Sequence, residues 1–147
     1  MDHKMKAISL WQPWASLIRT GIKKIETRGT SIRHRGPLLI HAAKRRAPWW
    51  IVQEISDALL RAGHGPMTLQ MPLGCLLCKV DVIDCKRVNT VNRPPENQLP
   101  WGDFSEGRYM WILDNLETFH PVLYRGMQGL FHIPDDVVDR IEFRRAE

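Results

Sequence analysis

The pattern of apolar and polar positions predicts a chain built mainly from strands. Short apolar runs, several of them alternating with polar residues, recur along the sequence and are bounded by Gly, Pro or Asn. We expect strands at 6–10, 22–28, 38–42, 74–88, 108–113, 119–124 and 129–132. The run at 74–88 is long enough to bend through more than one position in a sheet.

Helical periodicity is confined to a few places. Pro13 is well placed to open a helix that runs to Thr20 and ends at Gly21, because proline suits the first turn and glycine the residue after the last. Pro134 opens a short terminal helix. A further helix is predicted over 48–63, where the apolar residues share one face: Ile51, Ile55, Ala58, Leu59 and Ala62.

The segment 89–107 predicts a long irregular loop, since it contains three prolines. Loops of that length in compact domains often line binding sites. No repeat, low-complexity segment or linker divides the chain, so we expect a single domain over residues 1–147. Helices near the front and strands afterwards predict an α+β fold, a small mixed β-barrel flanked by helices.

Composition narrows the class of protein. The 147 residues are 44% hydrophobic and 25% charged, which is ordinary for a globular domain. No apolar stretch approaches the roughly 20 residues that a membrane-spanning helix needs, and the N-terminus lacks the apolar core of a secretory signal. The three cysteines, an odd number, lie within one apolar segment. We therefore expect a cytoplasmic protein with reduced thiols and no membrane partner.

Positive charge is concentrated in the first third of the chain. Residues 1–46 carry 11 basic and 2 acidic residues, a net charge of +9, whereas residues 47–147 carry 10 basic and 14 acidic residues, a net charge of −4. This asymmetry favours an anionic partner such as RNA or a nucleotide, and a solvated basic surface is the alternative.

No pattern predicts a metal or cofactor site. Cys75 and Cys78 have the spacing of half a zinc site, but no second pair of Cys or His completes four ligands. A spacing of three within a strand also places the two sulfurs on opposite faces, so core packing is the better interpretation. Walker, Gly-x-Ser-x-Gly and glycine-rich dinucleotide motifs are absent from the sequence. We expect a site that uses neither metal nor cofactor.

The segment Trp11-Gln12-Pro13-Trp14 places two large aromatic side chains and an amide at the start of a helix. An aromatic ring can stack on a base, and a glutamine can read a base edge by donating and accepting at once. Core packing is the alternative, and it is favoured for Trp14. His41 lies in the middle of a predicted strand and faces either the core or a cleft.

The segment 21–28 combines a carboxylate with several cations. Glu26 is either one half of a structural ion pair or a group that activates water while a cation stabilises an oxyanion. Strand alternation places Lys24, Glu26 and Arg28 on one face. Lys23 joins Glu26 only if the chain is still turning after Gly21.

These segments resemble the ASCH domain family, relatives of the PUA-like fold. The motifs that carry the resemblance are Lys6–Ile18 with its Trp-Gln-Pro-Trp, Gly21-x-Lys23-x-x-Glu26-x-Arg28, and the segments 36–44, 108–115 and 126–131. The resemblance implies a small β-barrel flanked by helices, with a cleft around 21–28. RNA binding has been proposed for the family. Some small bacterial members are amidohydrolases that remove the acyl group from N(4)-acetylcytidine, and another is described as a ribonuclease.

The leading hypothesis is an amidohydrolase acting on an N(4)-acylated cytosine nucleoside. In the amidohydrolase members the residue three positions after the motif lysine is a threonine nucleophile, where this chain has Glu26. We therefore expect Glu26 to act as base for water, Lys23 to hold the amide oxygen, and Arg28 to complete the catalytic set. Thr27 is a further candidate nucleophile, and Glu96 and Glu106 are candidates for the later glutamate of those members. The candidate substrate-binding residues are Trp11, Gln12, Pro13, His41 and Lys44.

The alternative hypothesis is a non-catalytic RNA-binding module. In that case basic residues of the first third contact phosphates while the cleft holds one unstacked base. A weak ribonuclease is the third hypothesis. The candidate phosphate contacts are Arg33, Arg35, Lys44, Arg45 and Arg46.

Overall fold

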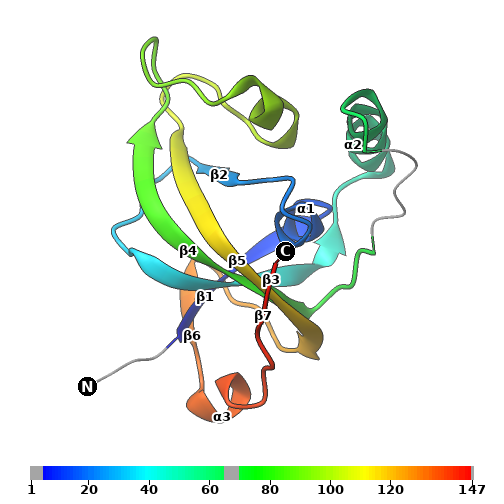
Figure 1. The fold of residues 1–147 in the computed structure, drawn as a ribbon, viewed down its shortest axis with the longest axis vertical. Coiled ribbons are helices and arrows are strands. Elements are labelled where there is room, and N and C mark those ends of the chain that lie inside the picture. Colours follow the sequence, from blue (N-terminus) through cyan, green and yellow to red (C-terminus); the bar gives the residue numbers. More distant parts are fainter. Residues whose placement is uncertain (1–4, 65–69, 147) are drawn as a thin grey trace.

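The structure is a computed structural model that describes residues 5–64 and 70–146 (Figure 1). Most of its elements are strands, as the apolar pattern predicts. In chain order they are β1 (Met5–Gln12), α1 (Trp14–Arg19), β2 (Ile25–Arg28), β3 (Gly36–Arg46), α2 (Trp49–Arg61), β4 (Cys75–Arg87), the 3₁₀ helix η1 (Glu96–Trp101), β5 (Tyr109–Leu123), β6 (Leu130–Ile133), α3 (Asp135–Val138) and β7 (Arg144–Arg145).

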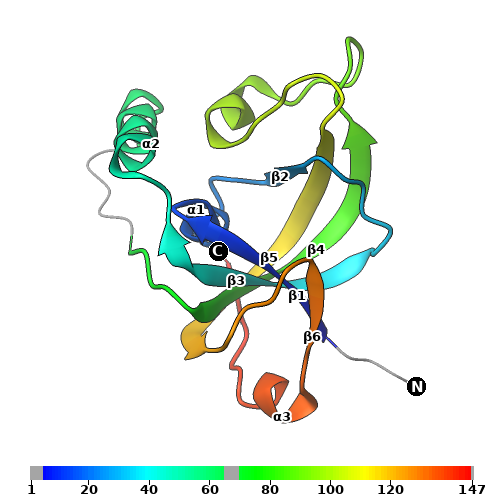
Figure 2. The ribbon, with the colours of Figure 1, turned by 180° about the vertical axis from the view of Figure 1, so that it is seen from behind.

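The strands form one strongly curved mixed sheet. Its order is β2-β5-β4-β3-β1-β6, with β7 paired to β5. The pairing of β1 with β3 is parallel, and the other pairings are antiparallel. Figures 1 and 2 show the long strands β4 and β5 bending across the molecule, with α2 and the yellow-green coil of η1 at one end and α3 at the other. The α+β class with a barrel-like sheet and flanking helices is therefore confirmed, although the sheet does not close.

Two apolar clusters position the elements around the later site. The largest lies inside the curved sheet, where α1 contributes Ala15 and Ile18 against β1, β3 and β4. A second cluster joins Leu17 of α1 to Leu59 of α2 and Trp101 of η1. Burial of such side chains contributes about 1.5–3 kcal/mol each. Because both clusters share α1, this helix fixes α2 and η1 relative to the strands.

Several boundaries differ from the expectation. The two strands expected on either side of Asp114 and Asn115 are one strand, β5, which bends there: Asn115 takes φ +54°, a conformation that asparagine tolerates. The register of β5 against β4 also shifts at three points, which lets both strands curve. The strand expected at 22–28 begins only at Ile25, and β7 has too few residues to leave an apolar pattern.

The two cysteines of the apparent half zinc site are buried in the same cluster, inside the curved sheet. Alternation predicts opposite faces, but against β3 the strand has one extra residue between Leu76 and Cys78, and this bulge brings both sulfurs to one side. Core packing is therefore confirmed. Within 5–64 and 70–146, no helix is long and apolar enough to cross a membrane.

Candidate functional site

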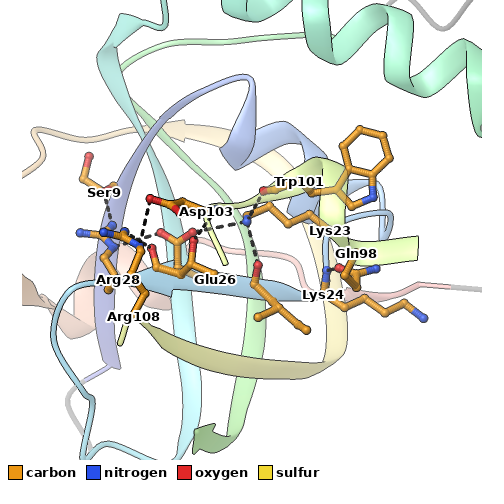
Figure 3. Close-up of polar contacts among 11 residues, drawn as sticks. Ser9, Lys23, Lys24, Glu26, Arg28, Gln98, Trp101, Asp103 and Arg108 are labelled. Carbon is orange, nitrogen blue, oxygen red and sulfur yellow. Dashed lines mark hydrogen bonds and ion pairs between the residues drawn. The ribbon is translucent and has the colours of Figure 1, made fainter. Parts of the chain in front are cut away.

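A cleft of about 510 Å³ opens where β1, β2, α2 and the segment 100–108 meet. We call it the cleft throughout. Its walls are aromatic, with Trp11, Trp14 and Trp101, and its floor carries Glu26 and Arg28 beside the buried Lys23. Figure 3 shows the polar side chains of this floor converging from β2 and from the segment that follows η1.

Lys23 reaches Glu26 because the chain is still turning before β2 starts. Gly21 takes φ +84°, which glycine adopts at little cost, and the backbone N–H of Lys23 donates back to the carbonyl of Leu17 at 3.0 Å. With β2 starting only at Ile25, the Lys23 Nζ lies 3.5 Å from Oε1 of Glu26. Lys23 therefore joins Glu26 because the chain is still turning after Gly21, as strand alternation requires.

Lys23 uses its donors on the protein itself. Its Nζ donates to the carbonyl oxygens of Ile25 at 2.7 Å and Trp101 at 2.6 Å, and the Glu26 carboxylate is its third acceptor. The residue is only 2% exposed, and this burial lowers the pKa of Lys23 below 10.5 although Glu26 acts in the opposite direction. An ammonium group has three N–H donors, so Lys23 orients Glu26 and ties η1 to β2. It has no donor left for the amide oxygen expected of it.

Glu26 bridges Lys23 to a second cation. Its Oε2 accepts a hydrogen bond from Nε of Arg28 at 3.0 Å, and the carboxylate side chain is 10% exposed. Arg28 in turn donates from Nη2 to the backbone oxygen of Ser9 at 3.2 Å and lies 5.7 Å from the ring centroid of Trp111. The three expected catalytic residues thus form one connected chain across the floor, and Arg28 is the member with guanidinium surface facing the cleft.

The segment after β4 closes the cleft from above. Gln98 of η1 accepts from the backbone N–H of Lys24 at 2.8 Å and donates to the carbonyl of Ile22 at 3.0 Å. The Thr27 hydroxyl accepts from the N–H of Asp103 at 3.1 Å, which gives the candidate nucleophile an anchoring role in this structure. The predicted irregular loop is therefore a docked wall with a 3₁₀ turn.

A second guanidinium, that of Arg108, enters the cleft from this wall. Its Nη2 donates to the carbonyl of Thr27 at 3.3 Å, and its Nε lies 3.4 Å from Oδ2 of Asp103. Hydrogen bonds from Ser105 lower the pKa of Asp103, so this carboxylate stays charged beside Arg108. The Nε of Arg108 is buried without a hydrogen bond of good geometry among the described residues, an incompletely satisfied donor at the cleft.

The expected substrate-binding residues are only partly gathered here. Trp11 is 45% exposed and lines the cleft. Gln12 is fully buried: its amide donates to Ser16 Oγ and the Pro72 carbonyl and accepts from the Ser16 N–H, so it locks α1 in place. Pro13 is buried at the N-cap of α1. Gln12 and Pro13 therefore shape the cleft from behind and do not line it.

His41 and Lys44 lie instead on a second hollow of about 710 Å³, which we call the groove. The groove adjoins the cleft, since Ser9, Trp11 and Arg28 line both. His41 is buried on its floor and Lys44 is exposed.

The basic residues of the first third divide between the two ends of β3. Arg33 and Arg35 precede the strand, whereas Lys44, Arg45 and Arg46 end it beside Trp11. Nine residues of strand from 35 to 44 span about 30 Å. Only the second group adjoins the cleft and groove, and the guanidinium of Arg45 lies 5.7 Å from the ring centroid of Trp11.

The sequence profile of one family, the ASCH domain, matches residues 8–123. The chain belongs to the ASCH domain family. Activating signal cointegrator 1 of Homo sapiens is 44% identical over 84 residues, which cover 53% of this chain and 14% of that protein, and the Mus musculus protein matches equally well. This ASCH domain therefore spans a small part of the length of those relatives.

Solved ASCH structures share the fold. The crystal structure of ASCH from Zymomonas mobilis has a TM-score of 0.58 at 16% identity and covers 96% of this chain and 98% of its own. A Tyr-to-Phe mutant of that protein has a TM-score of 0.57 at 16% identity, covering 95% of this chain and 100% of its own. At this identity the likeness shows the fold alone.

Sequence reasoning about this ASCH domain missed Trp101, Asp103 and Arg108. Glu96 and Glu106, the expected acidic partners, are exposed and do not line the cleft, whereas Asp103 and Glu54 do. The available signal was the length of the 89–107 loop, which indicated a binding segment without saying which of its side chains point inward. The described residues contain no group of three or more His, Cys, Asp or Glu placed to hold a metal ion.

Proposed function

We propose that the cleft of this ASCH domain binds one unstacked nucleotide of single-stranded RNA. The observation that carries this proposal is the convergence of two guanidinium groups, Arg28 and Arg108, on a hollow walled by tryptophans. Aromatic side chains stack on unpaired bases, and guanidinium groups bind phosphate through charge-assisted hydrogen bonds. A volume of about 510 Å³ suits a single nucleotide and is too small for a duplex.

Charge outside the cleft supports a strand that continues beyond this nucleotide. Lys44 and Arg125 line the adjoining groove, and Arg45 lies over Trp11 between the two hollows. Each is exposed, so each can neutralise a phosphate without first breaking a buried contact. Neighbouring phosphates of the bound strand then follow the groove, while Trp11 stacks on a base.

The proposal is tested by the salt dependence of binding to a short fluorescently labelled single-stranded RNA. For each phosphate contact removed, the slope of log affinity against log salt should fall by about 0.7. Lys44→Ala and Arg45→Ala should each reduce the slope, and Trp11→Ala should cost about 1–3 kcal/mol of binding at every salt concentration. Arg33→Ala, at the far end of β3, is the matched control and should change neither quantity. A flat salt response, or an equal effect of Arg33→Ala, would overturn the proposal.

A second candidate is hydrolysis of the acyl group from N(4)-acylated cytidine. It is favoured by Glu26, which lines the cleft beside a guanidinium. In this reaction Glu26 takes a proton from water, and Arg28 or Arg108 stabilises the oxyanion, since the Lys23 donors are already used. The test is incubation with N(4)-acetylcytidine, followed by the ultraviolet spectrum of released cytidine. No spectral change at high protein concentration, across several acyl groups, would exclude this candidate.

A further inference from the structure

Ser9 of β1 and His41 of β3 face each other across the parallel pairing of these strands. The Ser9 Oγ lies 2.9 Å from Nδ1 of His41, and Nε2 of the same ring lies 2.7 Å from the carbonyl oxygen of Tyr124. A carbonyl oxygen only accepts, so Nε2 carries the ring proton. Nδ1 of the neutral ring is then the acceptor, and the Ser9 hydroxyl donates to it.

The His41 ring is held in this orientation. It is 1% exposed, and the edge of Phe131 packs on it with ring centroids 5.9 Å apart. Burial lowers the pKa of His41 below 6.5, so the ring is neutral and accepting at neutral pH. A hydroxyl bonded to a base that is itself oriented by a third group is the arrangement that activates nucleophilic serines.

The pair is accessible from the groove. Ser9 is partly exposed and lines both hollows, and Arg28 donates to the backbone oxygen of Ser9, which places a guanidinium beside the serine. Gly126 leaves room for this arrangement. A Cβ there would lie 2.6 Å from Cε1 and 2.9 Å from Nδ1 of His41, and 3.2 Å from the Ser9 Oγ.

We propose that Ser9 is a nucleophile and His41 its general base, forming an acyl-transfer centre in the groove, at the border with the nucleotide-binding cleft. Its substrates are carboxylic esters with an anionic or polar group to meet Arg28 and Arg125. The Ser9 hydroxyl proton moves to Nδ1 of His41 as Oγ bonds to the ester carbon, whose carbonyl π electrons move to oxygen. The tetrahedral adduct collapses, the carbon–oxygen bond to the alcohol breaks, and the alcohol takes the proton from His41. Water then repeats the sequence and releases the acid from Ser9.

The experiment uses the whole chain with p-nitrophenyl acetate and, separately, with a fluorophosphonate probe. We expect release of p-nitrophenolate, a covalent adduct seen by intact mass, and peptide mapping of that adduct to Ser9. Ser9→Ala should abolish the adduct, and His41→Gln should slow its formation by about 10²- to 10⁴-fold. Ser31→Ala, at an exposed loop serine, is the matched control and should react like the wild type.

Folding and reactivity are separable here. Ser9→Ala leaves the buried Nδ1 of His41 without its donor, so its melting temperature should fall by a few degrees, and the variant is assayed well below it. If folded Ser9→Ala forms the adduct at the wild-type rate, or if the adduct maps to another residue, the acyl-transfer centre is refuted. Absence of any adduct on the wild type refutes it as well. Neither result depends on whether RNA binds the cleft.

Discussion

Replacing Glu26 by glutamine removes the charge that sits between Lys23 and Arg28. The side chains of Lys23 and Glu26 are 1% and 10% exposed, so the pair is buried. Removing one partner of a buried ion pair costs about 3–5 kcal/mol, because the remaining charge is left uncompensated. Because Lys23 keeps its two carbonyl acceptors in the variant, we expect a loss of unfolding free energy at the lower end of this range, about 3 kcal/mol. At roughly 2–4 °C per kcal/mol for a domain of this size, the melting temperature falls by about 6–12 °C.

The assay is thermal and urea unfolding of the wild type and the variant under the same conditions. Glu117→Gln is the matched control, because the ion pair of Glu117 with Lys79 has side chains 24% and 20% exposed. Pairs nearer the solvent contribute about 0–1 kcal/mol, so this control should lose only a few degrees at most.

A double-mutant cycle with Lys23→Met separates coupling from unrelated damage. If the two charges stabilise each other, the double variant loses less stability than the sum of the two single variants, by about 1 kcal/mol or more. Additive losses, or a Glu26→Gln protein that melts like the Glu117→Gln control, would refute the reasoning. In that case the ion pair of Glu26 with Lys23 does not contribute to the free energy of unfolding.

Other buried groups give further expected outcomes. Burial lowers the pKa of His41 below 6.5. Between that lowered pKa and about pH 6.5, the unfolded chain binds a proton that the folded chain does not. The free energy of unfolding therefore falls as the pH falls, by up to about 1.4 kcal/mol per pH unit. His41→Gln should remove this slope in urea unfolding, and an unchanged slope contradicts it. Burial raises the pKa of Cys78 to about 12, so a thiol reagent should modify the half-buried Cys85 but not Cys78 before unfolding. Gln98→Ala breaks two hydrogen bonds to the backbone of residues 22–24 and should lower the free energy of unfolding by about 1–3 kcal/mol. Amide hydrogen exchange at residues 22–24 should become faster. Unchanged exchange rates there would show that these two bonds do not hold η1 against this segment.

Local signals explain which parts of the fold were predictable. The positive φ of Gly21 follows from the tendency of glycine to adopt that conformation, and α2 follows from its apolar face. The strand expected from residue 22 begins only at Ile25, because the turn at Gly21 continues further than the apolar pattern indicates. The role of Gln12 also had a local signal, since its partner Ser16 lies four residues on, in the first turn of α1. These contacts, with the bond to the Pro72 carbonyl, occupy the amide and leave it none to offer a base.

Long-range contacts explain what could not be predicted. Lys23 binds the carbonyl of Trp101, a backbone atom 78 residues away that leaves no side-chain pattern. Arg108 reaches the cleft because the carbonyl of Thr27, 81 residues away, accepts a hydrogen bond from it and the nearby Asp103 pairs with it. The family resemblance indicates the motif Lys23-x-x-Glu26-x-Arg28. Only the three-dimensional contacts show that the N–H donors of Lys23 are bound to other groups of the protein.

The central claim, that the cleft takes one nucleotide of single-stranded RNA, is tested most directly by the indole N–H signals of the six tryptophans in a ¹⁵N-labelled sample. Trp11 and Trp14 line the cleft, and substitution by phenylalanine assigns their signals. On titration with a short single-stranded RNA, both signals should shift saturably, with the Kd found for the fluorescent RNA. If RNA binds while both signals stay unchanged, the nucleotide lies elsewhere and the account is contradicted.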